Sequence, residues 1–310
     1  MKIILPGGSG MVGSLAAAYF ANQGHSVIIL SRSPEKSRQQ LASQSGFSGN
    51  VQVHGWDGAT ARDWGELIDR ETAIINLVGE NLANKRWSLA QKQIILESRT
   101  RPGQAIVQAV EQAREIPAVL LQVSGSGYYG ISQGEIITEA DPPGNDFPAQ
   151  VCQAWETSTA PVEGMGVRRV VMRTGVVLSL RGGALPRLLL PFKLLIGGPL
   201  GNGRQWLAWI HELDQIAAFK YFIENPACQG VYNVASPNPV QNRDFAKAIA
   251  KAYGRPSWIP APAFAIRLLF GEMATVVLDG QRMIPQRLLA EGFKFQSAEP
   301  LAALKQLHSS

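Results

Sequence analysis

Four glycines within the first thirteen residues place the strongest constraint on how this 310-residue chain can fold. They stand at positions 7, 8, 10 and 13, directly after the apolar run Ile3–Leu5 and before a helical pattern. Gly7 can adopt backbone angles closed to other residues, Gly10 lets the backbone approach a pyrophosphate, and Gly13 lets the helix pack tightly on the strand. The N–H groups of the first helical turn then face the ligand. A purely structural glycine turn is the alternative, but the strand-to-helix context favours a dinucleotide-binding turn.

The second apolar run ends in an arginine where an NAD-binding fold places an acid. Residues 26–30 are followed by Ser31 and Arg32, roughly 20 residues beyond the glycines. An acid here binds the ribose hydroxyls of NAD, whereas an arginine pairs with a 2′-phosphate through two parallel hydrogen bonds. The position therefore favours NADP(H) over NAD(H) as the cofactor, and a solvated loop arginine is the alternative.

Composition and charge exclude several classes of protein. Apolar residues make up 45% and charged residues 17% of the chain, which is typical of a folded protein. The formal net charge of +5 suits an anionic ligand, but the basic residues lie singly or in pairs, so we expect no nucleic-acid partner. Cys152 and Cys228 lack metal-ligand spacing, so we expect no metal and a reducing compartment, the cytoplasm or, in a plastid-bearing source, the plastid stroma. We expect no signal peptide and no membrane span.

Strand-like and helix-like segments alternate over the first 180 residues. Strands are expected at Lys2–Leu5, Ser26–Leu30, Val51–His54, Ala73–Val78, Ala118–Val123 and Arg169–Met172. Several are continuously apolar, as in parallel strands covered by helices on both faces. We therefore predict an α/β fold, with a doubly wound parallel Rossmann sheet in residues 1–180 and a smaller substrate lobe in residues 181–310.

Helical patterns fill the intervals between these strands. Helices are expected at Met11–Gln23, Leu89–Thr100, Gln104–Arg114 and roughly Ala149–Ala160. The gap between the second and the third depends on Pro102 and Gly103, because this pair is expected to break or kink a helix.

Ligands of such a sheet bind beyond the carboxyl ends of its strands, so the residues after each strand are the first candidates for a site. After the fourth strand, the backbone of residues 77–79 can pass alongside the cofactor, with Gly79 as a plain turn residue the alternative. The fifth strand leads into Ser124 and Tyr128, whose hydroxyls suit hydrogen bonding to a carbonyl or an alcohol. Packing is the alternative role for the tyrosine.

His211 and Asp214 follow a tryptophan-rich segment further along the chain. A histidine here can relay a proton near neutral pH, or it can tie a loop to the backbone. Asp214 has the position of an N-cap for the helix expected at Gln215–Tyr221.

The motifs resemble those of a known family. They are GGSGMVGS, SRSP, NLVGENL, YYG, VCQAWE, RTGVVL, GGPLGNGRQWLAWIH and IPQRLL. From residue 2 to about residue 306 the chain is similar to atypical extended short-chain dehydrogenase/reductases of the NAD-dependent epimerase/dehydratase family, including the YfcH-like proteins. The resemblance implies an extended Rossmann fold that binds NADP(H). It implies cofactor contacts at Gly7, Ser9, Gly10, Met11, Val12, Gly13, Ser31, Arg32, Leu77, Val78, Gly79, Arg99, Gly175 and Val177. Extended members often form homodimers, and relatives in cyanobacteria and plastids are described as SulA-like cell-division factors.

One departure from the wider superfamily bears on activity. Typical members carry Tyr-x-x-x-Lys on the helix before the sixth strand, where the lysine lowers the pKa of the tyrosine. Here the corresponding spacing is Cys152-x-x-x-Glu156. We therefore hold two hypotheses. The first is an NADP(H)-dependent oxidoreductase or epimerase acting on a small molecule, with Ser124, Tyr128 or His211 in catalytic roles. The second is a non-catalytic NADP(H)-binding regulator that acts through partners, for instance in cell division.

Overall fold

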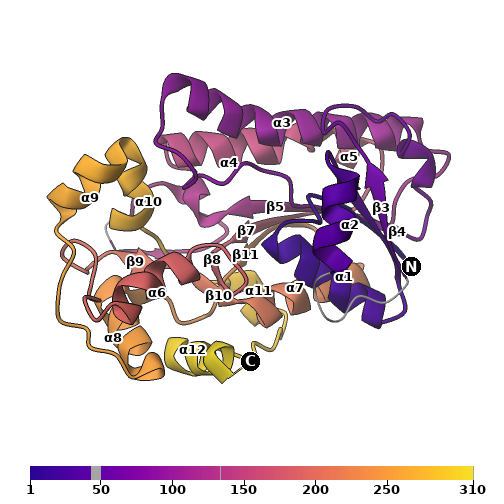
Figure 1. Ribbon diagram of the computed structural model, residues 1–310. Coiled ribbons are helices and arrows are strands. Elements are labelled where there is room, and N and C mark those ends of the chain that lie inside the picture. Colours follow the sequence, from indigo (N-terminus) through magenta and orange to yellow (C-terminus); the bar gives the residue numbers. More distant parts are fainter. Residues whose placement is uncertain (43–49, 133, 310) are drawn as a thin grey trace.

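A seven-stranded parallel sheet forms the centre of the molecule (Figure 1). The computed structural model describes residues 1–42, 50–132 and 134–309. The strand order is β11-β7-β5-β4-β1-β2-β3, and every neighbouring pair is parallel. The order reverses at β1, so the crevice beside the carboxyl end of β1 is the place where such sheets bind ligands. The predicted α/β fold with a doubly wound Rossmann sheet is confirmed.

The elements have the following bounds. The strands of the central sheet are β1 Lys2–Pro6, β2 Ser26–Ser31, β3 Val51–Gly55, β4 Thr72–Asn76, β5 Val119–Gly125, β7 Arg169–Thr174 and β11 Gly230–Val234. The short strands are β6 Ile136–Ile137, β8 Val176–Leu178, β9 Trp206–Leu207, β10 Trp209–His211, β12 Val240–Gln241 and β13 Arg282–Met283. The helices are α1 Met11–Asn22, α2 Pro34–Ala42, α3 Leu89–Gln112, α4 Phe147–Ser158, α5 Pro161–Gly164, α6 Leu185–Lys193, α7 Glu212–Glu224, α8 Asn242–Tyr253, α9 Ala263–Phe270, α10 Thr275–Leu278, α11 Gln286–Ala290 and α12 Pro300–Ser309.

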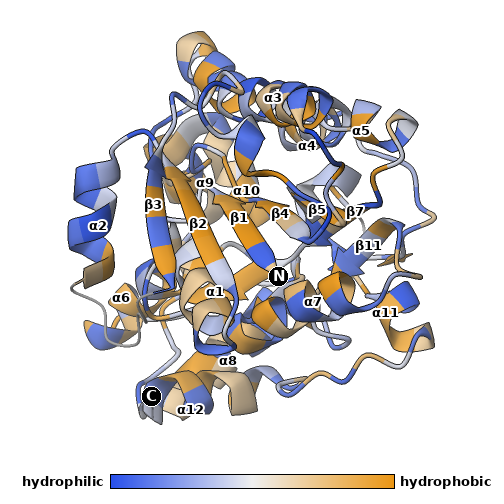
Figure 2. Ribbon diagram, turned by 90° about the vertical axis from the view of Figure 1, so that its right-hand side faces the viewer, coloured by the Kyte–Doolittle hydropathy of each residue, from blue (hydrophilic) through white to orange (hydrophobic). Residues whose placement is uncertain are grey.

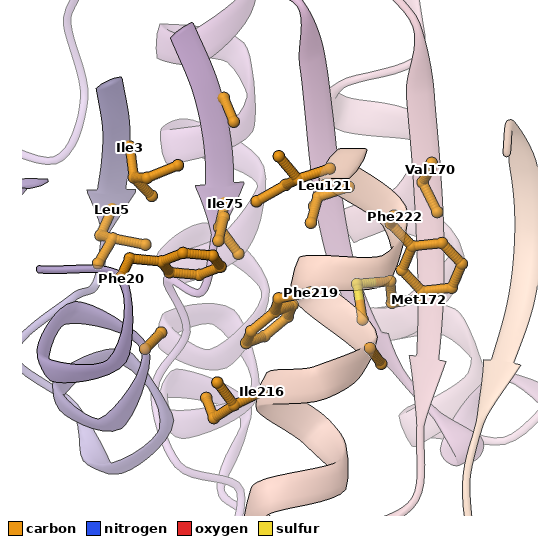
Figure 3. Close-up of a cluster of buried hydrophobic side chains, with 14 of the residues drawn as sticks. Ile3, Leu5, Phe20, Ile75, Leu121, Val170, Met172, Ile216, Phe219 and Phe222 are labelled. Atoms are coloured by element: carbon orange, nitrogen blue, oxygen red, sulfur yellow. The ribbon is translucent and has the colours of Figure 1, made fainter. Parts of the chain in front are cut away.

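Both faces of the central sheet are buried, which explains its continuously apolar strands. Along β1, Ile3 and Leu5 point to one face and Ile4 to the other, and all three are fully buried. On the first face, aromatic side chains such as Phe20 of α1 and Phe219 of α7 fill the core (Figure 3). On the opposite face α3 and α5 cover the sheet, and Figure 2 shows the apolar strands between the two helical layers.

The expected break in the long helix is wrong. Helix α3 runs without interruption from Leu89 to Gln112, with Pro102 inside it. Gly103 faces α4, where a Cβ would lie 1.9 Å from Ser158 Oγ. The Pro-Gly pair therefore marks the place where α3 and α4 approach each other closely, and packing against α4 outweighs the local preference for a break.

The chain after residue 180 contributes both to the region beyond the sheet and to the sheet itself. Strand β11 joins the edge of the central sheet beside β7, and α7 covers one face of that sheet. The short pairs β8–β10, β9–β12 and β6–β13 extend the molecule past the carboxyl ends of the central strands. Helices α6, α8, α9, α10 and α12 lie around them, at the left of Figure 1. These elements form the outer walls of the crevice.

Candidate functional site

The glycine turn after β1 has the geometry of an anion cradle. Gly7 has φ +80°, and a Cβ there would lie 2.9 Å from the carbonyl carbon of Leu77. A Cβ on Gly13 would lie 2.7 Å from Gly7 O, so helix α1 starts directly against the turn. Gly10 is the N-cap of α1 and provides no side-chain cap, which leaves the first N–H groups of the helix available to a ligand.

A cavity of about 370 Å³ opens in front of this turn, and we call it the turn cavity. Its lining includes most of the cofactor contacts predicted on this side, namely Gly7, Ser9, Gly10, Ser31, Arg32, Leu77, Val78 and Gly79. Arg32 is exposed, and no carboxylate within the described residues forms an ion pair with it. Lys36, a second cation that the sequence analysis missed, lines the same cavity. The turn cavity therefore joins an anion cradle to two positive charges, neither of which pairs with a carboxylate in the part of the chain that the structure describes.

A second cavity of about 520 Å³, which we call the central cavity, lies between the sheet and the outer elements. Four further predicted cofactor contacts line it, namely Met11, Arg99, Gly175 and Val177. Val12 and Gly13 line neither cavity and form the first turn of α1. The predicted cofactor contacts thus follow one path, from the end of β2 past the glycine turn to the end of β7.

Arg99 carries a buried charge without a counter-ion. Only 8% of the residue is exposed, and burial lowers the pKa of its guanidinium below the ordinary value. Its Nη1 donates to Ile95 O at 3.0 Å and to Ser98 Oγ at 3.4 Å, and no described carboxylate pairs with it. A Cβ on Gly79 would lie 2.8 Å from Arg99 Cζ, so only glycine leaves the guanidinium its place. A buried cation of this kind is stabilised by a negative partner, and no described carboxylate supplies one.

A third cavity of about 240 Å³, the inner cavity, adjoins the central cavity and shares Arg99 with it. It lies at the carboxyl ends of β5 and β7, and its walls include Ser126, Cys152, Trp155 and Trp206. The sequence analysis missed Ser126, because the pattern does not show which serine after β5 faces the cleft. Burial raises the pKa of Cys152 to about 11, so its thiol is protonated at neutral pH.

Ser124 lies beneath this cavity rather than in its wall. It is 3% exposed, and its Oγ donates to Glu156 Oε1 at 2.7 Å. Glu156 in turn accepts from Arg173, with Nε at 3.1 Å from Oε1 and Nη2 at 3.0 Å from Oε2. Although burial alone would lower it, these bonds and the charge of Glu156 raise the pKa of Arg173 above its ordinary value. The position of the superfamily lysine therefore holds half of a buried ion pair.

The two tyrosines after Ser124 belong to the same buried network. The guanidinium carbon of Arg173 lies 3.2 Å from the ring centroid of Tyr128. Tyr129 accepts a hydrogen bond from Arg173 Nη1 at 3.1 Å and donates to Asn233 Oδ1 at 2.7 Å, and burial raises its pKa to about 12. Neither ring lines the inner or the central cavity. A catalytic role for Tyr128 stays a prediction.

His211, the third predicted catalytic residue, caps a helix. It is 1% exposed, and its Nδ1 accepts from the Leu213 N–H at 3.2 Å, at the start of α7. Burial lowers its pKa, so the imidazole is neutral. The cap expected of Asp214 is therefore wrong; Asp214 instead accepts from the backbone N–H groups of Gln296 and Ser297. His211 lines none of the three cavities, and its catalytic role stays a prediction.

Two further features bear on the class of site. No three His, Cys, Asp or Glu residues in the described ranges gather closely enough to hold a metal ion. None of the helices described here is both long and apolar enough to cross a membrane.

Comparisons with known proteins place this geometry in context. Residues 3–235 match the model of the NAD dependent epimerase/dehydratase family, and residues 261–307 match a domain of unknown function. The chain is 36% identical to the epimerase family protein YfhF of Bacillus subtilis, covering 99% of this chain and 98% of that protein. It is 35% identical to mouse epimerase family protein SDR39U1, covering 99% of both. The crystal structure of human SDR39U1 with NADPH matches at a TM-score of 0.87 and 30% identity, over 100% of both chains.

Proposed function

The chain belongs to the NAD dependent epimerase/dehydratase family, and from that premise we propose that it is an NADP(H)-dependent oxidoreductase or epimerase acting on a small molecule in the inner cavity. One observation supports the proposal: a glycine cradle and two cations that pair with no described carboxylate, Arg32 and Arg99, line the two adjoining parts of the cleft. Three groups that favour negative charge suit a ligand with several phosphates. The human relative whose structure contains NADPH supports this choice of ligand.

The cradle and its cations fit a dinucleotide with a 2′-phosphate. The first turn of α1 would hold the diphosphate, because its N–H groups have no acceptor within the helix. Arg32 and Lys36 would hold the 2′-phosphate, and no acid stands at the end of β2 to repel it. Arg99 would balance negative charge near the middle of the cofactor. The bound nicotinamide supplies or accepts hydride.

The inner cavity supplies hydrogen-bond donors in place of the usual tyrosine and lysine. Ser126 lines it and would orient a substrate oxygen, and the Cys152 thiol would donate the proton that this oxygen needs. Burial raises the pKa of this thiol to about 11, so it holds that proton at neutral pH, and its Sγ donates to Gly125 O at 3.7 Å. The Glu156–Arg173 pair below holds Ser124 at the end of β5, because Glu156 accepts from the Ser124 hydroxyl. The catalytic roles of Ser124, Tyr128 and His211 stay predictions.

Isothermal calorimetry with NADPH and NADH tests the cofactor assignment. We expect tighter binding of NADPH, and we expect Arg32→Glu to weaken it about ten- to a hundredfold, the range for losing hydrogen bonds to a charged group. NADH binding is expected to change little. Arg114→Glu is the matched control, since Arg114 is exposed and lines none of the three cavities. Equal affinity for the two cofactors, or no effect of Arg32→Glu, would overturn the assignment.

The regulatory alternative, in cell division or elsewhere, stays a prediction. NADPH consumption with any carbonyl compound that is lost in Ser126→Ala would argue against it.

A further inference from the structure

The segment of residues 276–281 closes the cleft from the side opposite the sheet. It lies in the region that matches a domain of unknown function. A Cβ on Gly280 would lie 1.9 Å from Trp206 O, so the segment crosses β9 in direct backbone contact. Hydrogen bonds hold it on both sides: Gln205 Nε2 donates to Val277 O at 3.0 Å, and Gln281 Nε2 donates to Gly130 O at 2.5 Å. The segment is therefore a fixed wall.

Asp279 is the charged side chain that this wall presents to the cleft. It lines both the inner and the central cavity. Its carboxylate forms no hydrogen bond or ion pair with the described residues, and burial raises its pKa above the ordinary value. The charge of Arg267 acts on this carboxylate, but the segment itself is anchored by its backbone and by Gln281 and not by Asp279.

Two of the three charged residues that line the inner cavity are acidic. Its charged lining residues are Arg99, Asp146 and Asp279. If Arg99 pairs with a cofactor phosphate, as proposed above, the two carboxylates are left facing the remaining space. Asp146 accepts a hydrogen bond from the Ala149 N–H as the N-cap of α4, whereas the carboxylate of Asp279 accepts none from the described residues. Trp155 lines the same space with 8% of its surface exposed.

We propose that Asp279 binds a hydrogen-bond donor of the substrate, a hydroxyl or an ammonium group, and disfavours substrates that carry a carboxylate at this end. The inference rests on the proposed function, because it assigns Arg99 to the cofactor. It gives the region of unknown function a role as the specificity wall of the cleft. Asp279 is a specificity residue that selects the substrate and transfers no proton.

Three single-ring probes, benzylamine, benzyl alcohol and benzoate, test the proposal with NADPH-saturated protein. Saturation-transfer NMR measures their affinities for wild type, Asp279→Asn and the control Asp244→Asn, an exposed acid on α8. We expect the amine and the alcohol to bind wild type more tightly than benzoate, and Asp279→Asn to reduce the preference for amine over benzoate about tenfold. The control is expected to behave as wild type. The difference between amine and alcohol shows which donor fits better.

Two outcomes would overturn the inference. One is an unchanged order of the three probes in Asp279→Asn, measured on variant protein whose melting temperature equals that of wild type. The other is loss of NADPH affinity in Asp279→Asn, which would make Asp279 a cofactor contact. Failure of the proposed function gives a different result, because wild-type protein would then bind no NADPH. In that case the probe preference would be measured in the NADPH-free protein.

Discussion

Glu156→Gln is expected to destabilise the protein strongly, because it strands the buried charge of Arg173. The two side chains are 11% and 5% exposed, and the carboxylate accepts two hydrogen bonds from the guanidinium and one from Ser124. Glutamine keeps one acceptor oxygen but turns an NH₂ group toward a guanidinium that can only donate. Removing one partner of a buried pair costs about 3–5 kcal/mol, a large share of the 5–15 kcal/mol typical of a whole protein.

The double substitution Glu156→Met/Arg173→Met separates this charge effect from lost packing. It removes both charges together, and replacing a buried ion pair by apolar side chains is often close to neutral. Tyr129 keeps its hydrogen bond to Asn233, so that part of the network survives. We therefore expect the double variant to regain about 2 kcal/mol or more relative to Glu156→Gln.

Urea unfolding at neutral pH, followed by circular dichroism, measures both free energies of unfolding. The penalty of Glu156→Gln is expected to persist between about pH 6 and pH 9, because an arginine side chain is effectively always protonated in this window. If the double variant is as unstable as Glu156→Gln, the reasoning from an unpaired charge is refuted.

Two further predictions concern packing and thiol chemistry. Gly103→Ala is expected to lower the free energy of unfolding, because a Cβ 1.9 Å from Ser158 Oγ costs about 1–3 kcal/mol in overpacking. This cost outweighs a helix-propensity gain of about 1 kcal/mol. Thermal melting measures the loss, and the double variant Gly103→Ala/Ser158→Gly should recover stability if the clash is the cause. Alkylation of Cys152 by iodoacetamide, followed by peptide mass spectrometry, is expected to stay slow at pH 8 and to accelerate toward pH 11, because burial raises its pKa to about 11. Rapid labelling at pH 8 would contradict the buried, protonated thiol. The same shift means that the thiol favours the folded state below its unfolded pKa, and that this contribution is lost as pH rises through about 11.

The sheet and the turn were predictable from sequence because their signals are local. Apolar runs locate six of the seven central strands to within two residues, whereas the edge strand β11 was not predicted. The glycines after Leu5 were predictable because Gly7 has a positive φ that favours glycine. The course of α3 through Pro102 was not predictable, since it depends on contact with α4, a helix that lies well over thirty residues further along the chain.

The inner cavity shows the same limit at the level of single side chains. Ser124 and Ser126 are two residues apart, yet one is bonded beneath the cleft and the other lines it, because the strand ends between them and the chain turns. Arg173, the partner of Glu156, lies on β7, so no residue spacing on α4 predicts the ion pair. Asp279 reaches the cleft only through the fold of the outer elements.

A ribosome releases the glycine turn of residues 7–13 long before it releases residues 276–281. At about 5–20 residues per second the interval between them is on the order of tens of seconds. During that time the nascent chain carries the diphosphate cradle but lacks the wall that borders the central and inner cavities. A coenzyme that docks on the emerging half meets the cradle, Arg32 and Arg99, but not Gly175, Val177 or the wall of residues 276–281. Enclosure of a bound molecule is thus expected to follow synthesis as a separate, late event.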